Sequence, residues 1–394
     1  MSHYKPYPAY RDSGVKWIGQ VPEHWKKMPF KRVASICNGH DYKEVENADG
    51  AYPVIGSGGE FARASDFMFD GESVLLGRKG TIDKPLYING PFWAVDTMFY
   101  TKIADNAFPK FVYYNALTIP FGLYSTNTAL PSMAGEDLSS HLIVAPDFEE
   151  QKAIATCVDR ETTRIDALIT KKTRFIELLK EKRQALITHA VTKGLDPNVA
   201  MKDSGVEWIG VVPAHWSVAI LKRFVVFQRG HDLPSDTRVE GTVPVVSSGG
   251  YSGTHNVAIA KAPGIVTGRY GSLGEFTFVE EDYWPLNTAL YSIELHNNDH
   301  RFVWYLLQNI SDLFLLYSAK AAVPGIDRND IHEIYVAAPQ HDEQRQIAKY
   351  LDEQCDRINA ITEKTQRSID LLKERRAAFI TAAVTGQIDL RESA

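Results

Sequence analysis

Two histidine–aspartate pairs are the residues of this chain best suited to acid–base or metal chemistry. His40-Asp41 has its counterpart in His231-Asp232, 191 residues later. A histidine beside a carboxylate can act as an oriented general base, or supply ligands to a metal ion. Neither pair has a third ligand at a suitable spacing. We therefore favour loop histidines that make local hydrogen bonds.

Two further segments hold only parts of catalytic motifs. Residues 89–93 (NGPFW) are similar to the loop with which amino-methyltransferases hold a flipped base, but no glycine-rich cofactor loop precedes them. Residues 146–152 (PDFEEQK) have the residue types of a metal-dependent nuclease at too short a spacing, and 339–345 (PQHDEQR) does not repeat them. An acidic first turn of a helix explains them better. No P-loop occurs, so the sequence predicts no catalytic site and no metal site.

Composition indicates a globular protein of the reducing cytoplasm. Apolar residues make up 44% and charged residues 23% of the 394 residues, and no apolar run is long enough to predict a membrane span. The start of the chain lacks the pattern of a signal peptide. The three cysteines form no pair at metal-ligand spacing, so we expect buried free thiols. The net charge of −6 mildly disfavours a nucleic-acid partner.

The whole chain is a tandem duplication. The stretch DSGVKWIGQVPEHW (12–25) returns as DSGVEWIGVVPAHW (203–216), identical at 11 of 14 positions. After a two-residue slip the offset becomes 193, and residues 177–192 match residues 370–385 at 11 of 16 positions. A repeat of about 190 residues is too long for a solenoid. The chain is thus two copies of one module.

Each copy predicts a strand-rich block followed by one long helix. Short β-type runs such as 73–77, 98–103 and 264–268 are bounded by Gly, Pro and Asp, and a few helices such as 110–117 interrupt them. The fold class is α+β, with two mixed α/β blocks separated by two long antiparallel, coiled-coil-like helices in a pseudo-two-fold arrangement. The predicted segments are 1–146 (N-terminal segment and block 1), 147–194 (helix), 195–338 (linker and block 2) and 339–394 (helix and tail).

The two helices carry apolar residues at 3–4 spacing, which predicts an imperfect seam between them. Gly194 and Gly386 follow the last turns, where helices commonly stop. The predicted seam and partner-facing residues are Ile154, Val158, Ile165, Leu168, Phe175, Leu179 and Leu186 in the first helix and Ile347, Leu351, Ile358, Ile361, Leu372 and Phe379 in the second.

The repeated segments resemble the specificity (S) subunit of type I restriction-modification systems. The resemblance rests on WIGQVPEHWKKMPFKRV, on WIGVVPAHWSVAILKRF and on LLKEKRQALITHAVTKGL, and it covers essentially the whole chain. It implies that each block is a target recognition domain reading half of a bipartite, asymmetric site in double-stranded DNA. The helices would be a spacer that docks two methyltransferase (M) subunits, with restriction (R) subunits in the complex. S-adenosylmethionine, ATP and magnesium would belong to those partners, with no cofactor in this chain.

Candidate DNA contacts fall into three groups. Arg78 and Arg269 lie in Gly-Arg-x-Gly turns of both copies, which suits a phosphate contact, with an arginine that caps its own loop as an equal alternative. The Ser-Gly-Gly turns would let the backbone approach DNA, although plain hairpin turns explain them equally well. The third group holds residues that differ between the copies and are expected to read bases. Lys79 adds charge beside the first arginine. The Ser-Gly-Gly turns are Ser57, Gly58 and Gly59 in the first copy and Ser248, Gly249 and Gly250 in the second. The residues expected to read bases are Tyr42, Lys43, Ser125, Thr126, Asn127, Arg238, Tyr270, Ser318 and Lys320.

Two other functions compete with this interpretation. The first is a duplicated scaffold that assembles proteins without DNA, which the acidic net charge favours slightly. The second is a two-lobed enzyme with a site between the lobes, using His40-Asp41 and His231-Asp232. A bound metal, or turnover by the isolated chain, would favour the enzyme.

Overall fold

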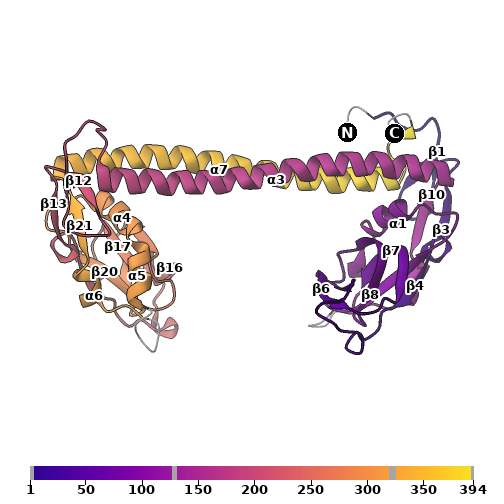
Figure 1. Ribbon diagram of the computed structural model, residues 1–394, viewed down its shortest axis with the longest axis horizontal. Coiled ribbons are helices and arrows are strands. Elements are labelled where there is room, and N and C mark those ends of the chain that lie inside the picture. Colours follow the sequence, from indigo (N-terminus) through magenta and orange to yellow (C-terminus); the bar gives the residue numbers. More distant parts are fainter. Residues whose placement is uncertain (1–3, 127–130, 319–324, 392–394) are drawn as a thin grey trace. The chain divides into compact units, whose positions relative to one another are not determined.

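The computed structural model describes residues 4–126, 131–318 and 325–391, and it divides into two compact units. Unit 1 combines residues 1–172 with 367–394, and unit 2 comprises 173–366. The division cuts both long helices. Each unit therefore holds one strand-rich block, the first part of the helix that follows it, and the last part of the other helix (Figure 1).

The strand-rich block of unit 1 is built around one six-stranded sheet in the order β4-β9-β7-β8-β5-β6. Three predicted runs form elements here, since 73–77 ends β7, 98–103 forms β9 and 110–117 lies in α1 with a one-residue shift. The elements of this part of the chain are β1 (Tyr10–Asp12), β2 (Gln20–Pro22), β3 (Lys26–Pro29), β4 (Ala34–Asn38), β5 (Tyr52–Gly56), β6 (Gly59–Ala64), β7 (Phe69–Gly77), β8 (Leu86–Ala94), β9 (Met98–Ile103), α1 (Pro109–Ala116), α2 (Gly135–Ser140) and β10 (Leu142–Ala145).

Unit 2 repeats this plan with one break. Its sheets have the orders β14-β20-β17-β18 and β16-β15-β19, because the counterpart of β8 is divided into β18 and β19. The parallel pairing is kept, with Val54 opposite Trp93 in unit 1 and Val245 opposite Trp284 in unit 2. The elements are β11 (Met201–Asp203), β12 (Val211–Pro213), β13 (Ser217–Ile220), β14 (Val226–Arg229), β15 (Val243–Ser247), β16 (Gly250–His255), β17 (Gly264–Gly268), β18 (Phe276–Val279), β19 (Trp284–Pro285), β20 (Ala289–Glu294), α4 (His300–Asn309), α5 (Ser311–Ser318), α6 (Arg328–His332) and β21 (Tyr335–Ala338).

The two long helices are α3 (Phe148–Lys193) and α7 (His341–Val384). In unit 1, Ile154 and Val158 of α3 share a buried cluster with Phe379 and Val384 of α7. In the same unit, Arg376 forms a 2.9 Å ion pair with Asp166, further along α3. Residues later in α3 contact residues earlier in α7, so the two helices run antiparallel. Unit 2 has the same arrangement, with buried residues 187–191 packed against 347–355.

The predicted seam is correct in part. Ile154, Val158, Ile165, Leu179, Ile347, Leu351, Ile358 and Phe379 are buried, and Leu186 and Leu372 are half-buried. Leu168, Phe175 and Ile361 have side chains that are 40–45% exposed, so they do not belong to the seam, and their assignment as partner-facing residues stays a prediction. A helix with 3.6 residues per turn drifts by about 20° per heptad from a strict 3.5-residue seam, so a seam does not stay on one face of a long straight helix.

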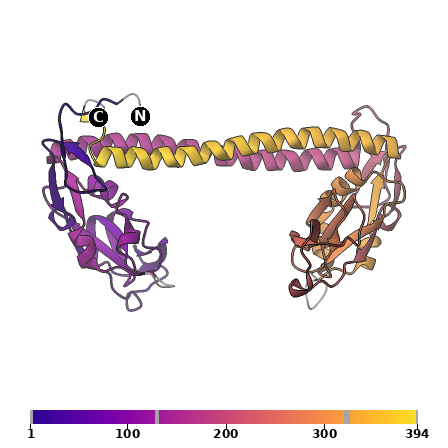
Figure 2. The same ribbon diagram turned by 180° about the vertical axis from the view of Figure 1, so that it is seen from behind.

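Glycines end both helices as predicted. Gly194 follows Lys193 with φ +77°, and Gly386 follows Val384 by two residues with φ +74°. Glycine adopts this left-handed conformation more readily than any other residue, so it closes a helix at low cost. After Gly386 the C-terminal tail lies beside the N-terminal segment (Figures 1 and 2), where Asp389 N–H donates 2.8 Å to Lys5 O.

Two of the three cysteine side chains are buried as expected. Cys157 and Cys355 lie in the helix clusters of units 1 and 2, while Cys37 is half-buried on β4. Among the helices of the described residues, none is both long and apolar enough to cross a membrane.

Candidate nucleic-acid interface

A tight turn after the central strand presents Arg78 in unit 1. Gly77 ends β7, and a Cβ on it would lie 2.3 Å from the Thr81 carbonyl oxygen, so the position accepts only glycine. The Arg78 N–H donates 2.8 Å to Thr97 O, and Arg78 O accepts 3.0 Å from Met133 N–H. Gly80, at φ +81°, completes the turn. The backbone of Arg78 is therefore fixed at both its polar groups.

The second Gly-Arg-x-Gly turn has the same backbone. A Cβ on Gly268 would lie 2.3 Å from Ser272 O, and Gly271 also has φ +81°. The Arg269 N–H donates 2.9 Å to Thr288 O, and Arg269 O accepts 3.0 Å from Ile326 N–H. The two copies thus hold the same arginine on the same scaffold, whereas the residue after it is Lys79 in one and Tyr270 in the other.

The Ser-Gly-Gly segments are hairpin turns. In unit 1, Gly56 pairs with Gly59 across the β5–β6 turn, which contains Ser57 and Gly58. In unit 2, Ser247 pairs with Gly250 across Ser248 and Gly249. Gly59 and Gly250 have φ of +104° and +94°, which explains the glycine at those positions. A plain hairpin turn, which the sequence offered as an equal alternative to a DNA contact, therefore accounts for the conformation of both segments.

In unit 2 the structure brings the two candidate turns together. A Cβ on Gly268 would meet the Ser248 Cβ at 3.3 Å, and one on Gly249 would meet Ser272 Oγ at 3.6 Å. Residues from the hairpin β15–β16 and from the turn after β17 therefore form one continuous surface. The two turns are about 20 residues apart in the sequence, so the sequence alone did not predict that they meet.

The two histidine–aspartate loops have structural contacts. Main-chain N–H groups of His40 and His231 donate 2.9 and 2.8 Å to Ala94 O and Pro285 O, while their carbonyls accept from the indoles of Trp93 and Trp284. The Asp41 carboxylate accepts 3.1 Å from Lys43 N–H, and that of Asp232 accepts from the Asn287 amide. Of these bonds, the one between Asp41 and Lys43 is local in the sequence, whereas both histidines bond through their main chains to residues 53 or 54 positions later. In the part of the chain that the structure describes, no three His, Cys, Asp or Glu side chains cluster as metal ligands.

The diverging candidates of unit 1 lie in two places. Tyr42 packs edge-on against the exposed Phe61 at 5.4 Å, with Lys43 exposed beside it. Thr126 Oγ1 lies 3.0 Å from Ser132 Oγ, and the backbone of Ser132 forms an isolated β-bridge with Lys79. These contacts bring the loop of Ser125 and Thr126 to the Gly-Arg-x-Gly turn. Asn127 lies outside the described residues.

The diverging candidates of unit 2 are less uniform. Arg238 is half-buried and donates 2.5 Å from Nη1 to Ser252 O, so its guanidinium is bound to strand β16. Tyr270 is 39% exposed. Ser318 ends α5, while Lys320 lies outside the described residues. Sequence comparison of the two copies missed Arg229 and Arg328, because neither belongs to a motif and only the fold brings them to Arg269.

The doubled opening holds the start of the long helices. Trp25 Nε1 donates 3.0 Å to Glu150 Oε1 in unit 1, and Trp216 Nε1 donates 3.0 Å to Glu343 Oε1 in unit 2. A histidine ring nitrogen lies 2.8 and 2.7 Å from the second carboxylate oxygen of each. In unit 1 the Tyr7 hydroxyl also donates to Glu150, and burial together with this carboxylate raises the pKa of Tyr7.

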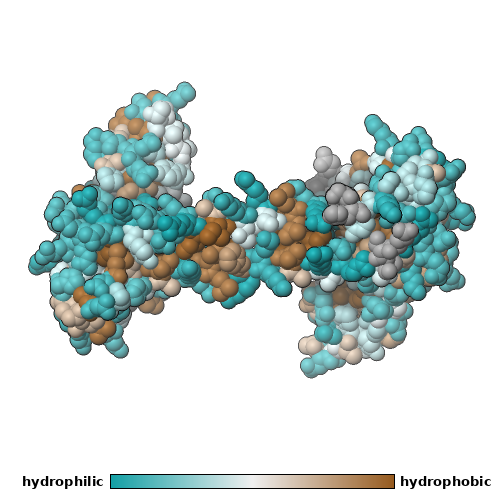
Figure 3. Space-filling view, turned by 90° about the horizontal axis from the view of Figure 1, so that it is seen from above, coloured by the Kyte–Doolittle hydropathy of each residue, from teal (hydrophilic) through white to brown (hydrophobic). Residues whose placement is uncertain are grey.

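Among the described residues of the two long helices, five large apolar side chains are at least 40% exposed, and four of them occupy equivalent positions of the two copies. In unit 1 these are Leu168 and Leu371, and in unit 2 they are Phe175, Leu178 and Ile361, all 40–58% exposed. At the offset of 193, Leu168 corresponds to Ile361 and Leu178 to Leu371. Figure 3 shows apolar surface along the helices. Repeated apolar exposure of this kind is typical of a surface that another protein covers.

Comparisons with known proteins place this architecture among specificity subunits. In an alignment 423 positions long, the chain is 20% identical to the type I restriction enzyme EcoBI specificity subunit of Escherichia coli, covering 96% of this chain and 89% of the relative. It is 21% identical to the EcoprrI specificity subunit of Escherichia coli over 169 residues, 42% of each chain.

Solved structures share the fold. A chain from a study of complex assembly and conformational transition of the type I R-M system matches with a TM-score of 0.71 and 13% identity, covering 93% of this chain and 99% of that one. The HsdS subunit from Thermoanaerobacter tengcongensis matches with a TM-score of 0.52 and 14% identity, covering 96% and 100%.

The family assignment comes from the repeated pattern itself. The family described as "Type I restriction modification DNA specificity domain" matches residues 22–178 and again 214–371. The two matches begin at the Val-Pro-x-His-Trp segments and run through the strand-rich blocks into the helices. Because they cover well over half of the chain, this protein belongs to the family of type I restriction-modification DNA specificity proteins.

Proposed function

We propose that this chain reads a bipartite, asymmetric site in double-stranded DNA, one half with each strand-rich block, as part of a type I restriction-modification complex. The observation that carries the proposal is the doubled turn. Arg78 and Arg269 are held by equivalent backbone hydrogen bonds, yet the neighbouring residues differ. A common scaffold with different side chains is the arrangement expected of two readers with different targets.

Two joined readers gain affinity from their connection. Once one block is bound, the other is held near its own half-site at a high effective concentration, so modest binding energies combine. The helices α3 and α7 would act as the spacer between the half-sites. The length of DNA that is not read would follow from helix length, at about 1.5 Å per residue.

The exposed apolar residues of the helices suit partner proteins. Their repetition at the 193-residue offset offers the same surface twice, which matches the expectation of two methyltransferase subunits, with restriction subunits completing a cytoplasmic complex. The chemistry would then belong to the partners. S-adenosylmethionine, ATP and magnesium are assigned to them, and the isolated chain is expected to transfer no methyl group and cleave no DNA.

Exchange of one block tests this function most directly. The block 26–146 is closed by its own strands, since Lys26 of β3 lies opposite Ala145 of β10, and Ser217 lies opposite Ala338 in the second block. Replacing 26–146 by the block of a relative, in cells that also supply the methyltransferase, should change one half of the methylated sequence. The other half and the gap should persist.

The reciprocal exchange of 217–338 is the matched control and should change the opposite half. Sequencing of methylated adenines in genomic DNA reads out both. If one exchange altered both halves, independent reading would be wrong. A two-lobed enzyme with a shared site would lose activity in both exchanges, and a scaffold that does not bind DNA would show no dependence of methylation on either block.

A further inference from the structure

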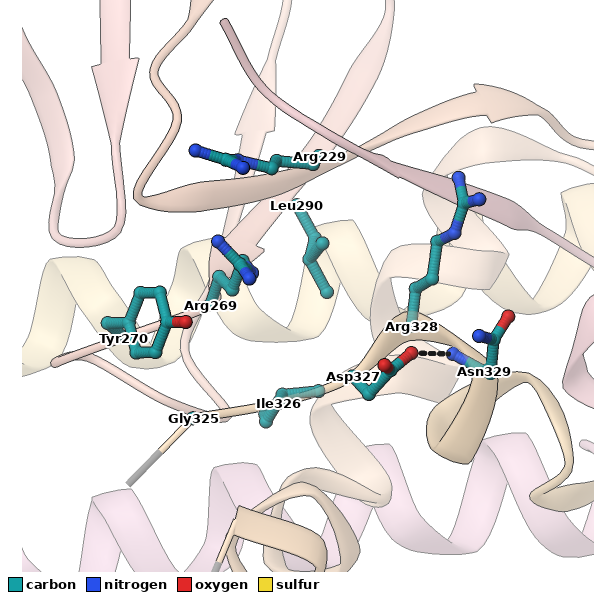
Figure 4. A pocket seen from close by; sticks show the side chains of 9 residues that line it. All are labelled: Arg229, Arg269, Tyr270, Leu290, Gly325, Ile326, Asp327, Arg328 and Asn329. Carbon is teal, nitrogen blue, oxygen red and sulfur yellow. Dashed lines mark hydrogen bonds between the residues drawn. The ribbon is translucent and has the colours of Figure 1, made fainter. Parts of the chain in front are cut away.

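A pocket of about 480 Å³ in the second recognition block gathers three arginine side chains. Arg229 ends strand β14, Arg269 lies in the Gly-Arg-x-Gly turn and Arg328 begins α6. Figure 4 shows Arg229 and Arg269 on one side of Leu290 and Arg328 on the other. Three separate elements thus supply positive charge to one cavity, with the first and second arginine 40 positions apart in the sequence and the second and third 59 positions apart.

Local packing orients the central arginine. The Arg269 guanidinium carbon lies 4.6 Å from the centre of the Tyr270 ring, a cation–π distance. Gly325 packs against the same ring, since a Cβ there would lie 2.5 Å from a ring carbon. Tyr270 therefore lies against a bare backbone, and its ring supports Arg269. A side chain at position 325 would displace the tyrosine.

The three guanidinium groups have no carboxylate partner within the described residues, where none of them forms an ion pair or side-chain hydrogen bond. The nearest acid in the pocket, Asp327, caps α6 by accepting 2.8 Å from Asn329 N–H. The block as a whole is acidic, with nine Lys and Arg against thirteen Asp and Glu in 217–338. Like charges gathered in an acidic block without partners indicate a binding site for an anion.

The first block lacks this pocket chemistry. Asn38 stands where the second has Arg229, and each lies opposite the equivalent residue of the neighbouring strand, Phe99 or Leu290. Gly135 stands in place of Arg328, and a Cβ there would lie 3.3 Å from the Phe99 ring. Arg78 donates 3.3 Å to Asp96 O. Only the turn arginine is common to both blocks.

We propose that Arg229, Arg269 and Arg328 form a phosphate-binding pocket for the DNA backbone that anchors the second half-site alone. This inference rests on the proposed DNA-reading function and adds an asymmetry to it. Arginine is always charged, and its planar fork of donors matches phosphate oxygens. The turn arginine, Arg78 in the first block and Arg269 in the second, would contact the backbone of both half-sites. Arg229 and Arg328 would add two contacts in the second half-site alone.

Salt dependence of DNA binding tests the pocket. The chain is reconstituted with its methyltransferase partner, and affinity for a duplex carrying the methylated site is measured by fluorescence anisotropy between 50 and 200 mM salt, a range over which phosphate contacts dominate the change. Arg229→Ala and Arg328→Ala should each reduce the slope of log affinity against log salt by about 1, and the double variant by about 2. Both side chains are exposed, so folding is preserved, as thermal unfolding verifies.

Three comparisons make the result decisive. Lys261→Ala removes an exposed cation outside the pocket, and Asn38→Ala changes the equivalent position of the first block; both should leave the slope as in the wild type. Arg229→Lys with Arg328→Lys keeps the charge and should restore most of the slope. Methylated sequences should stay unchanged in all variants, because phosphate contacts carry no base identity.

Two outcomes would overturn the pocket as a phosphate site. One is a wild-type slope in the double alanine variant. The other is relaxed recognition at one base pair of the second half-site, in the alanine and lysine variants alike, which would assign the arginines to guanine edges. A wild-type complex that bound no specific duplex would refute the proposed function instead, before any variant was compared.

Discussion

The indole of Trp25 donates its N–H to the carboxylate of Glu150, 125 residues later, over 3.0 Å. Trp216 repeats the bond to Glu343 at the same distance. The segment that occurs twice in the sequence is therefore the structure that receives the first turn of each long helix. In both places the last turn of the opposite helix reaches the same tryptophan, since Cβ atoms on Gly386 and Gly194 would lie 3.4 and 3.5 Å from the two indoles.

Loss of either glutamate should destabilise the protein, and the first more than the second. Glu150→Ala leaves the buried Trp25 N–H and the Tyr7 hydroxyl without their acceptor, which costs about 2–4 kcal/mol, whereas Glu343→Ala affects a more exposed pair and costs about 1–3 kcal/mol. The Gln variants retain an oxygen and should cost less. Urea unfolding followed by tryptophan fluorescence measures the difference. Equal losses would show that Tyr7 contributes nothing.

Stability should fall between pH 6.5 and pH 4 because of His141. This buried ring stacks on Trp17 at 4.7 Å and has its Nδ1 2.8 Å from the Tyr124 hydroxyl. Burial lowers the pKa of His141 to about 4. In that pH window the unfolded chain binds a proton that the folded chain does not, so acid favours unfolding, by up to about 3 kcal/mol at pH 4.

His141→Gln provides the comparison. The variant is less stable at pH 7 because it loses the ring contacts, but its stability should decline less than that of the wild type from pH 6.5 to pH 4. Chemical unfolding at several pH values gives both curves. Parallel curves would mean that another group is responsible.

Charges on the exposed helix surface should weaken partner binding without unfolding the chain. Leu178 and Leu371 are equivalent residues, 46% and 58% exposed. Their joint replacement by Asp should reduce affinity for the methyltransferase subunit about tenfold or more, since an apolar interface then receives a desolvated charge. Stability should change by less than about 0.5 kcal/mol per site. Calorimetric titration measures the affinity.

The exposed polar-face positions Gln184 and Ala377 are also equivalent, and Asp at both is the matched control. That control should bind the methyltransferase normally. Comparable losses in both pairs would point to general charge repulsion rather than to a specific apolar surface.

The termini should be movable to the linker between the copies. Gln387 Nε2 donates 2.6 Å to Gln20 O, and the Asp389 N–H donates to Lys5 O, so the tail and the N-terminal segment already lie together. A chain that joins residue 391 to residue 4 and opens between Asn198 and Val199 should fold with the same helix content and direct methylation to the same sequence. A changed target would show that the order of the blocks matters.

Much of the architecture follows from the sequence alone. Residue identities at a fixed offset establish two copies of one module. Duplication explains why two tryptophans, a proline and a histidine recur at the same spacing 191 residues later. The long helices follow from apolar periodicity and their ends from Gly194 and Gly386, because helix formation and termination depend on neighbours within a few residues. The Gly-Arg-x-Gly turns are equally local, since Gly80 and Gly271 are required by their own φ angles.

Contacts between distant residues were decided only by the tertiary structure. Leu168, Phe175 and Ile361 lie outside the seam because a 3–4 spacing predicts an apolar stripe but not where that stripe drifts off the face that the other helix covers. The meeting of Arg229, Arg269 and Arg328 depends on strand order in the β14-β20-β17-β18 sheet, which no single segment encodes. Likewise, a tryptophan and a glutamate 125 residues apart form a hydrogen bond because the folded block closes on itself through β3 and β10, bringing its first strand to the start of its helix.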